Sequence, residues 1–202
     1  MFYETKDPHG LKHNPFKSLV VPRPIGWVSS QDRNGVVNLA PYSFFNAVAS
    51  EPPIVMFSSN GAHSEGGYKD SVSNVQDTGE FVCNLAVWEN REAMNTTSTM
   101  AARSVDEFAL SGLTPVPSKL VKPPRVKESP VHLECKYLQT VELPCDNPEL
   151  ANLVVFGHVV GIHIDDSIIN DGMIDMDAFK PIARLGYFDY AVVDHVFTMR
   201  RP

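Results

Sequence analysis

Short apolar segments with alternating polar positions dominate the first 60 residues of the chain. Residues 22–59 read PRPIGWVSSQDRNGVVNLAPYSFFNAVASEPPIVMFSS, and an Asn34-Gly35 pair separates two of the alternating stretches. Such a pair between alternating apolar segments is a strong signal of a β-hairpin. We expect a strand, a tight turn and a second strand, then a polar and aromatic loop through residue 50, and a further strand at residues 54–57.

The later segments continue the β pattern, with a few short helices between them. A helix is expected from Asp70 or Ser71, either of which can cap it, to about Gln76, with Gly79 beyond its end. A strand is expected over residues 80–86, helices over 89–97 and 105–111, and strands over 131–143, 153–164 and 187–198. Many short strands with peripheral helices predict a mainly β fold of the antiparallel barrel type.

A proline-rich segment interrupts this pattern at residues 114–130. Its five prolines exclude a regular helix or a central strand. We interpret it as an extended arm over the surface, because too little chain lies on either side for two separate cores. A length of 202 residues also favours one domain, so we expect residues 1–202 to form a single unit.

Composition narrows the class of protein. Hydrophobic residues make up 43% of the chain and charged residues 20%, which are ordinary globular values, and the net charge of −7 argues against a nucleic-acid binder. Three cysteines without a C-x-x-C spacing suggest neither a disulfide framework nor a zinc site. The N-terminus has no apolar signal core, and no apolar run approaches the roughly 20 residues that span a bilayer. We therefore expect a cytoplasmic protein without a membrane partner.

The sharpest local candidate for chemistry is Lys69-Asp70-Ser71. A glycine-rich stretch precedes these residues, and they begin an expected helix. A helix N-terminus presents unpaired N–H groups and a partial positive charge, which favour a phosphate. Lys69 adds a full charge and Ser71 a hydroxyl donor. Taken alone, the triplet also fits a solvated lysine before an ordinary N-cap.

Other small polar groups lie at strand ends. Ser29-Ser30 and Ser58-Ser59 each end an expected strand, where they would offer hydroxyl and backbone donors to one ligand, although turn composition explains most serine pairs. Asn46 and Ala47, in the expected loop, would present amide and backbone groups to the edge of a pyrimidine-like ring.

Several common motifs are absent. The seven histidines are poorly spaced for a metal, and the acidic loop DDSIINDGMIDMD fails the EF-hand ligand pattern, so we expect no metal site. There is no G-x-G-x-x-G and no G-x-x-x-x-G-K-[ST], which argues against a Rossmann domain and a P-loop.

Three linked motifs carry a family resemblance. The segments PRPIGWVSS, NLAPYSFFNAVASEPPIVMFSS and GYKDSVSN resemble the flavin reductase-like family of FMN-binding split β-barrels, and the likeness runs from about His9 to the C-terminal ARLGYFDYAVVD. The resemblance implies a homodimeric barrel that binds FMN and either reduces free flavin or passes electrons. In that family an RLG-type corner lies beside the flavin, which adds Arg184 at the pocket rim.

These observations lead to a functional hypothesis. We expect an NAD(P)H-dependent flavin reductase that passes hydride from NADH or NADPH to FMN, with a monooxygenase or redox protein as a further partner. No side-chain catalyst is expected, because hydride transfer needs no general base. A flavoredoxin-type electron carrier and a non-catalytic flavin- or haem-related binding module remain alternatives. The expected cofactor-binding residues are Ser29, Ser30, Asn46, Ala47, Ser58, Ser59, Lys69, Asp70, Ser71 and Arg184.

Overall fold

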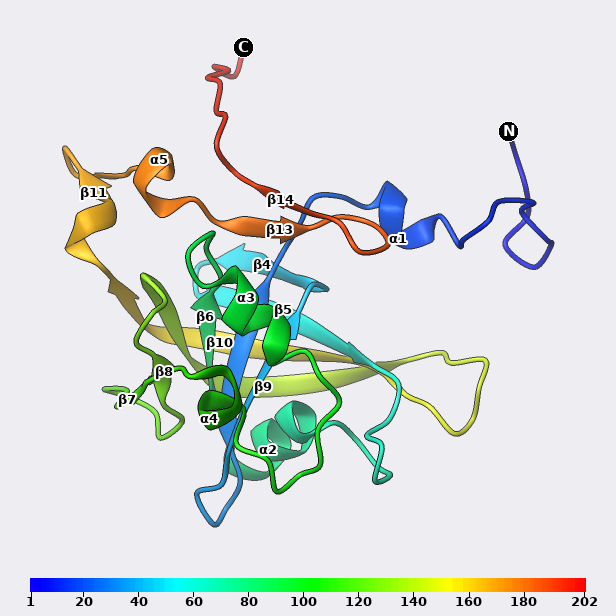
Figure 1. The fold of residues 1–202 in the computed structure, drawn as a ribbon, viewed down its shortest axis with the longest axis horizontal. Coiled ribbons are helices and arrows are strands. Elements are labelled where there is room, and N and C mark those ends of the chain that lie inside the picture. Colours follow the sequence, from blue (N-terminus) through cyan, green and yellow to red (C-terminus); the bar gives the residue numbers. More distant parts are fainter.

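The computed structural model describes residues 1–202 and has a split β-barrel as its centre (Figure 1). A seven-stranded antiparallel sheet with the order β3-β2-β6-β9-β10-β5-β4 forms the barrel wall. Its strands are β2 (Gly26–Gln31), β3 (Val37–Tyr42), β4 (Phe45–Ser50), β5 (Pro53–Asn60), β6 (Glu80–Leu85), β9 (Val131–Leu143) and β10 (Asn152–Ile164). The sequence-based expectation of a mainly β barrel with peripheral helices is confirmed.

The β2–β3 hairpin follows directly from its turn residues. The strands pair from Gly26↔Tyr42 to Gln31↔Val37. In the turn, Asp32 Oδ1 accepts hydrogen bonds from the N–H groups of Asn34 and Val36, each at 2.8 Å. Gly35 has a φ of +87°, which glycine adopts without strain. The Asn34-Gly35 signal thus correctly located this hairpin.

The two edge strands of the sheet are neighbours in the sequence. Only Ser43 and Phe44 separate β3 from β4, and the N–H of Ser58 donates to the Phe44 carbonyl at 2.7 Å. The expected loop through residue 50 is therefore wrong over residues 45–50, including Asn46 and Ala47, which form an edge strand paired with β5. Only Phe45 of β4 is buried, so the strand lacks the alternating pattern that would reveal it.

Helix α2 (Asp70–Thr78) packs against the barrel and buries Val72 and Val75 in its core. Lys69 occupies the N-cap position, in place of the expected Asp70 or Ser71, and Gly79 ends the helix in the left-handed conformation. The rings of Tyr42, Phe57 and Phe81 continue this core from the barrel side. The start of α2 is consequently held at a fixed place beside β3.

A second core covers the outer face of the barrel. Along β2, Val28 points into the barrel core and Trp27 into the second core, and both are fully buried. Helices α3 (Arg91–Thr96) and α4 (Glu107–Ser111) contribute Met94 and Phe108 to this layer. The Trp27 Nε1–H donates to Thr97 Oγ1 at 2.9 Å, which ties the end of α3 to the barrel wall.

The proline-rich arm folds back on itself. Strand β7 (Pro115–Val116) pairs with β8 (Arg125–Val126), so the segment is a short hairpin as well as an extended arm. The fully buried Glu134 carboxylate accepts the N–H groups of Lys119 at 2.8 Å and Leu120 at 2.6 Å, and also contacts His163 Nε2. These contacts fasten the arm to β9.

The C-terminal part adds small elements around the barrel. They are η1 (Asp166–Ile168), β11 (Ile169–Asn170), β12 (Met173–Ile174), α5 (Met176–Phe179) and a sheet of β1 (Arg23–Pro24), β13 (Ile182–Arg184) and β14 (Tyr190–Val192). The expected strand at 187–198 is wrong beyond these three residues of β14, because Tyr187 has a positive φ in the preceding turn and the chain after 193 has no strand partner.

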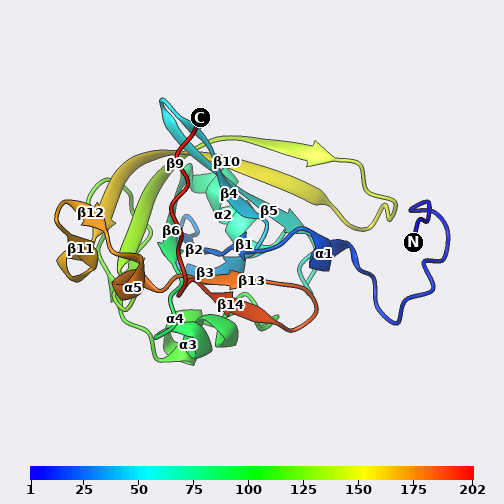
Figure 2. The ribbon, with the colours of Figure 1, turned by 90° about the horizontal axis from the view of Figure 1, so that it is seen from above.

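Both chain ends project away from the barrel, the C-terminal tail as seen in Figure 1 and the N-terminal segment as seen in Figure 2. The N-terminal segment leads into α1 (Phe16–Leu19), which buries none of its residues. The C-terminal tail exposes Phe197 and Met199. None of the helices combines the length and the apolar character needed to cross a membrane.

Candidate functional site

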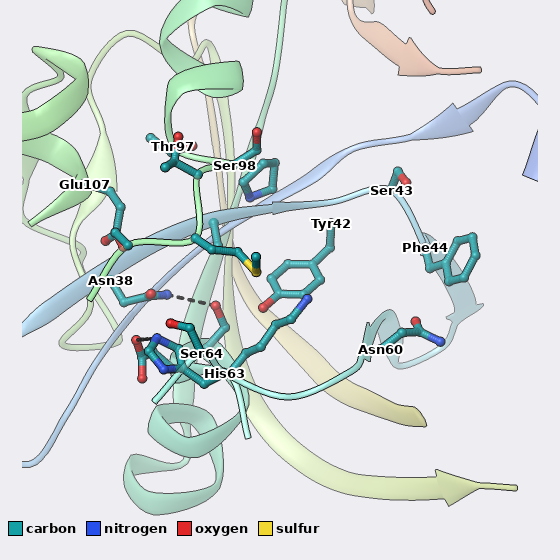
Figure 3. A pocket seen from close by; sticks show the side chains of 18 of the residues that line it. Asn38, Tyr42, Ser43, Phe44, Asn60, His63, Ser64, Thr97, Ser98 and Glu107 are labelled. Atoms are coloured by element: carbon teal, nitrogen blue, oxygen red, sulfur yellow. Dashed lines mark hydrogen bonds and ion pairs between the residues drawn. The ribbon is translucent and has the colours of Figure 1, made fainter. Parts of the chain in front are cut away.

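A cavity of about 300 Å³ opens beside the corner between β3 and β4. The corner, the first residues of α2, the loop before it and the segment 97–101 after α3 line this cavity, which we call the corner cavity (Figure 3). Its lining is mostly polar, and its volume lies at the lower end of the range for small-molecule sites.

Two lysines face the corner cavity without an acidic partner. Lys17 and Lys69 both line it, and neither takes part in an ion pair. Burial lowers the pKa of Lys69, and the charge of Lys17 lowers it further. The N–H groups of Asp70 and Ser71 at the start of α2 donate to no acceptor in the chain. Cationic side chains and free helix N–H groups together form a site for an anion such as a phosphate.

Buried hydrogen bonds hold the polar wall beside α2. The Asn38 Nδ2–H₂ group donates to Ser71 Oγ at 2.8 Å (Figure 3) and more weakly to Ser30 Oγ at 3.4 Å. Burial raises the pKa of Tyr42, while its hydroxyl contacts with Ser71 and Ser59 act in the opposite direction. Tyr42 therefore presents a neutral hydroxyl at this wall.

Arg103 holds the glycine-rich loop against the start of α2. Its Nη2 donates to the carbonyls of Gly66 at 2.8 Å and Tyr68 at 3.1 Å, and its Nη1 pairs with the Asp70 carboxylate. His63 Nε2 lies 3.5 Å from the other oxygen of Asp70 (Figure 3). The negative charge of Asp70 is thereby paired, which leaves the lysines to set the charge of this end of the cavity.

Glu107 is a buried carboxyl that reaches the corner cavity from α4. Its Oε2 accepts the Leu39 N–H at 3.1 Å, and burial raises its pKa against the opposing effect of that hydrogen bond. The residue lines the corner cavity beside Asn38 (Figure 3). Sequence reasoning missed Glu107 because its position depends on α4 packing against β3, and no local pattern signals that contact.

The corner cavity unites four of the residues expected from the sequence, which are Ser58, Lys69, Asp70 and Ser71. Ser30 and Ser59 lie behind the lining, where Ser30 accepts from Asn38 and Asn74 and Ser59 is buried beside Tyr42. The expected set of cofactor-binding residues did not include Lys17, Asn38, Tyr42, Thr97 or Ser98, which also line the cavity.

The other four expected residues lie elsewhere. The Ser29 hydroxyl donates to the Pro124 carbonyl at 2.5 Å under the proline-rich arm. Asn46 and Ala47 are exposed on the edge strand β4, because β4 turns only Phe45 toward the barrel core. Arg184 lies on β13 in a second cavity, where its guanidinium stacks on Tyr190. No group of three or more His, Cys, Asp or Glu side chains is arranged to hold a metal ion.

Several known proteins resemble this chain in sequence or in structure. A protein of Aquifex aeolicus (strain VF5) is 43% identical over 169 residues, which are 83% of each chain. The structure resembles nitrilotriacetate monooxygenase component B from Bacillus cereus, with a TM-score of 0.86, 30% identity and 98% of both chains covered. It also shares its fold with a putative flavin reductase with a split barrel domain from Shewanella frigidimarina, with a TM-score of 0.84, 23% identity and 100% of both chains covered. The model of the flavin reductase like domain matches residues 18–188, and the chain belongs to this family.

Proposed function

We propose that this protein binds FMN in the corner cavity and passes hydride from NADH or NADPH to the flavin. The observation that carries the proposal is the pair of lysines, Lys17 and Lys69, which face the cavity without an acidic partner beside free N–H groups of α2. An FMN phosphate fits this combination of charges and donors.

The chain supplies binding and orientation. Lys69, Lys17, the Ser71 hydroxyl and the first N–H groups of α2 would hold the phosphate, and Ser58 lines the same cavity. Ser30, Ser59 and Asn38 would fix the donors behind this end through their hydrogen bonds. When bound, the flavin supplies the hydride-accepting centre, while the protein controls its position and electrostatics. Ser29, Asn46, Ala47 and Arg184 lie outside the cavity and are not included in the proposed set.

Glu107 would lie against the bound ligand on the α4 side of the cavity. Its buried carboxyl stays protonated to a higher pH than an exposed glutamate, since burial raises its pKa. In the protonated form it can donate one hydrogen bond to an acceptor on a ligand, and it then adds no negative charge beside the lysine-rich end. No side-chain general base is assigned, because hydride transfer removes no proton from the donor.

We further propose a homodimer that serves a partner monooxygenase or redox protein. Helix α1 exposes 61% of Phe16 and 71% of Leu19, and the tail exposes 77% of Phe197, all apolar surface outside the barrel core. A two-fold dimer is the commonest arrangement that would cover such surface. The name of the Bacillus cereus protein, a monooxygenase component, favours a role in which reduced flavin is handed to an oxygenase.

The test is anaerobic addition of NADH or NADPH to the protein with FMN. Rapid bleaching of the yellow colour is expected, at a rate that rises with protein concentration. Bleaching by dithionite but not by either nicotinamide would replace the reductase with an electron carrier of flavoredoxin type. A protein that takes up no FMN at all would overturn the proposal.

A further inference from the structure

A second cavity of about 440 Å³ lies between α3 and the small sheet of β13 and β14. Figure 1 and Figure 2 both show α3 beside these strands. Apolar and aromatic side chains form most of the lining, among them Trp88, Met94, Ile182, Phe188 and Tyr190. We call it the α3 cavity. Trp88 is 46% exposed and Phe188 92% exposed, so flat aromatic surfaces are open to a ligand.

Two guanidinium groups flank these aromatic surfaces. The Cζ of Arg91 lies 3.7 Å from the centre of the Trp88 ring, and the Cζ of Arg184 lies 4.4 Å from that of Tyr190. Arg184 forms no ion pair, but its Nη2 donates to the Tyr187 carbonyl. Arg91 donates from Nη1 to the Trp88 carbonyl at 2.6 Å, and its Nε lies 3.5 Å from the exposed Glu92. Each guanidinium has five N–H donors, so both arginines keep further N–H groups for an anion while they stack on the rings. The α3 cavity therefore suits a planar aromatic ring that carries an anionic group.

Asn95 adds a donor and an acceptor to the same lining. Its side-chain amide makes no hydrogen bond within the chain. An amide of this kind is the side chain that reads an adenine edge, where it donates to one ring atom and accepts from the exocyclic amine. Among aromatic anions, a purine nucleotide uses all three elements, namely the stacking faces, the guanidinium groups and the amide.

The α3 cavity adjoins the corner cavity through a single helix. Arg91, Met94 and Asn95 of α3 line the former, whereas Thr97 and Ser98, which follow the helix, line the latter. Arg91 and Thr97 are about 9 Å apart at 1.5 Å per residue. A dinucleotide, with two bases joined through two riboses and a pyrophosphate, is long enough to occupy both cavities.

We propose that the α3 cavity binds the adenosine phosphate half of the nicotinamide dinucleotide, whose nicotinamide reaches the corner cavity past Thr97 and Ser98. This inference rests on the proposed function and assigns that co-substrate a binding subsite. In Figure 3, Thr97 and Ser98 lie across the cavity from His63 and Ser64, which adjoin the start of α2. The adenylate of FAD is attached at the phosphate end, so it would extend out of the corner cavity on the side away from α3.

A binding measurement without flavin tests the subsite directly. Trp27 is fully buried and Trp88 exposed, so a ligand in the α3 cavity should alter the fluorescence of Trp88 alone. Titration of flavin-free protein with 5′-AMP should give saturable quenching, and Trp88→Phe should abolish the signal. Arg91→Met and Arg184→Met should each weaken 5′-AMP binding at least tenfold. Arg33→Met, which removes an exposed charge paired with Asp77, should leave it unchanged.

Two further readouts separate this subsite from the flavin site. Arg91→Met and Arg184→Met should raise the KM for the nicotinamide dinucleotide at least tenfold while kcat and the Kd for FMN stay within twofold. The adenylate assignment would be overturned if benzoate quenched the fluorescence and 5′-AMP did not. It would also be overturned if both folded arginine variants bound 5′-AMP as tightly as the wild type. Binding of 5′-AMP in a protein that oxidises neither NADH nor NADPH would instead overturn the proposed function and the dinucleotide as the ligand.

Discussion

Lys17 and Lys69 come from segments more than 50 residues apart in the sequence, yet they line one cavity, and the charge of Lys17 lowers the pKa of Lys69. Two like charges that share a cavity repel each other until an anion lies near both. A bound phosphate would relieve this repulsion and pair both ammonium groups.

Replacing Lys69 should therefore weaken FMN binding. Lys69→Ala removes one charge-assisted contact, worth roughly 1.5–3 kcal/mol, and should raise the Kd for FMN about tenfold to a hundredfold. Lys12→Ala removes an exposed lysine outside the cavity and serves as the control. Isothermal titration of the two folded variants makes the comparison, and an unchanged Kd in Lys69→Ala would remove the phosphate assignment.

Two arginines pair with opposite ends of α2 and give a matched test of the loop contact. Arg103 pairs with Asp70 at the start of the helix, and Arg33 with Asp77 near its end, at 3.1 Å. Arg103→Met should weaken FMN binding by about tenfold, because the Asp70 charge is left close to the phosphate and the glycine-rich loop loses its carbonyl contacts. Arg33→Met should have no effect on the same titration. Equal effects of both variants would point to a general charge effect.

The three natural flavins should bind in a defined order. FMN should bind more tightly than FAD, because a terminal phosphate fits the start of α2. The chain has no Rossmann segment that would bind the adenylate of FAD. Riboflavin should bind with a much lower affinity than FMN, because it leaves Lys69 and the helix N–H groups without an anion. Fluorescence-quenching titrations measure all three affinities. Equal affinities for riboflavin and FMN would show that the phosphate end has been misplaced.

The stability of the fold should fall as the pH falls from about 6.5 to about 4. Burial lowers the pKa of His132 from 6.5 to about 4, and Arg125 and His163 lower it too, against the hydrogen bond to Val126 and the charge of Glu134. In this window the unfolded chain binds a proton that the folded protein does not, so the free energy of unfolding rises with pH. Full protonation costs roughly 3 kcal/mol.

Denaturant unfolding near pH 7 and near pH 4.5 measures this effect. His132→Gln should reduce the difference in unfolding free energy between the two conditions, because the titrating group is gone. His195→Gln, in the exposed tail, is the control and should retain the wild-type difference. A wild-type difference that survives unchanged in His132→Gln would assign the pH effect to other groups.

Local signals in the sequence predicted the elements whose structure is decided locally. The Asn34-Gly35 pair located the β2–β3 hairpin, and Gly79 marked the end of α2. Strand β4 was not predicted, because its residues after Phe45 are exposed and show no alternation. It forms through its pairing with β5. A single sequence carries no sign of such pairing. The strand expected at 187–198 failed for the converse reason, since apolar residues in the tail have no neighbouring strand.

The candidate site divides in the same way. The proposed phosphate end could be located from the sequence because Lys69, Asp70 and Ser71 are consecutive residues at the start of a helix. The remaining lining, such as Asn38 and Glu107, is brought there by the packing of α2 and α4 against β3. Spacing along the chain gives no distance between these segments, so the extent of the cavity required the fold.

The position of α3 between two cavities carries a thermodynamic consequence. Thr97, at its end, lines the corner cavity and accepts a hydrogen bond from buried Trp27, while Arg91, at its beginning, lines the α3 cavity. Any ligand that shifts this helix on binding changes the affinity at its other end. Linkage requires the effect to be reciprocal, so flavin would change the affinity for adenylate by the same factor by which adenylate changes the affinity for flavin. One six-residue helix would then couple the two binding equilibria.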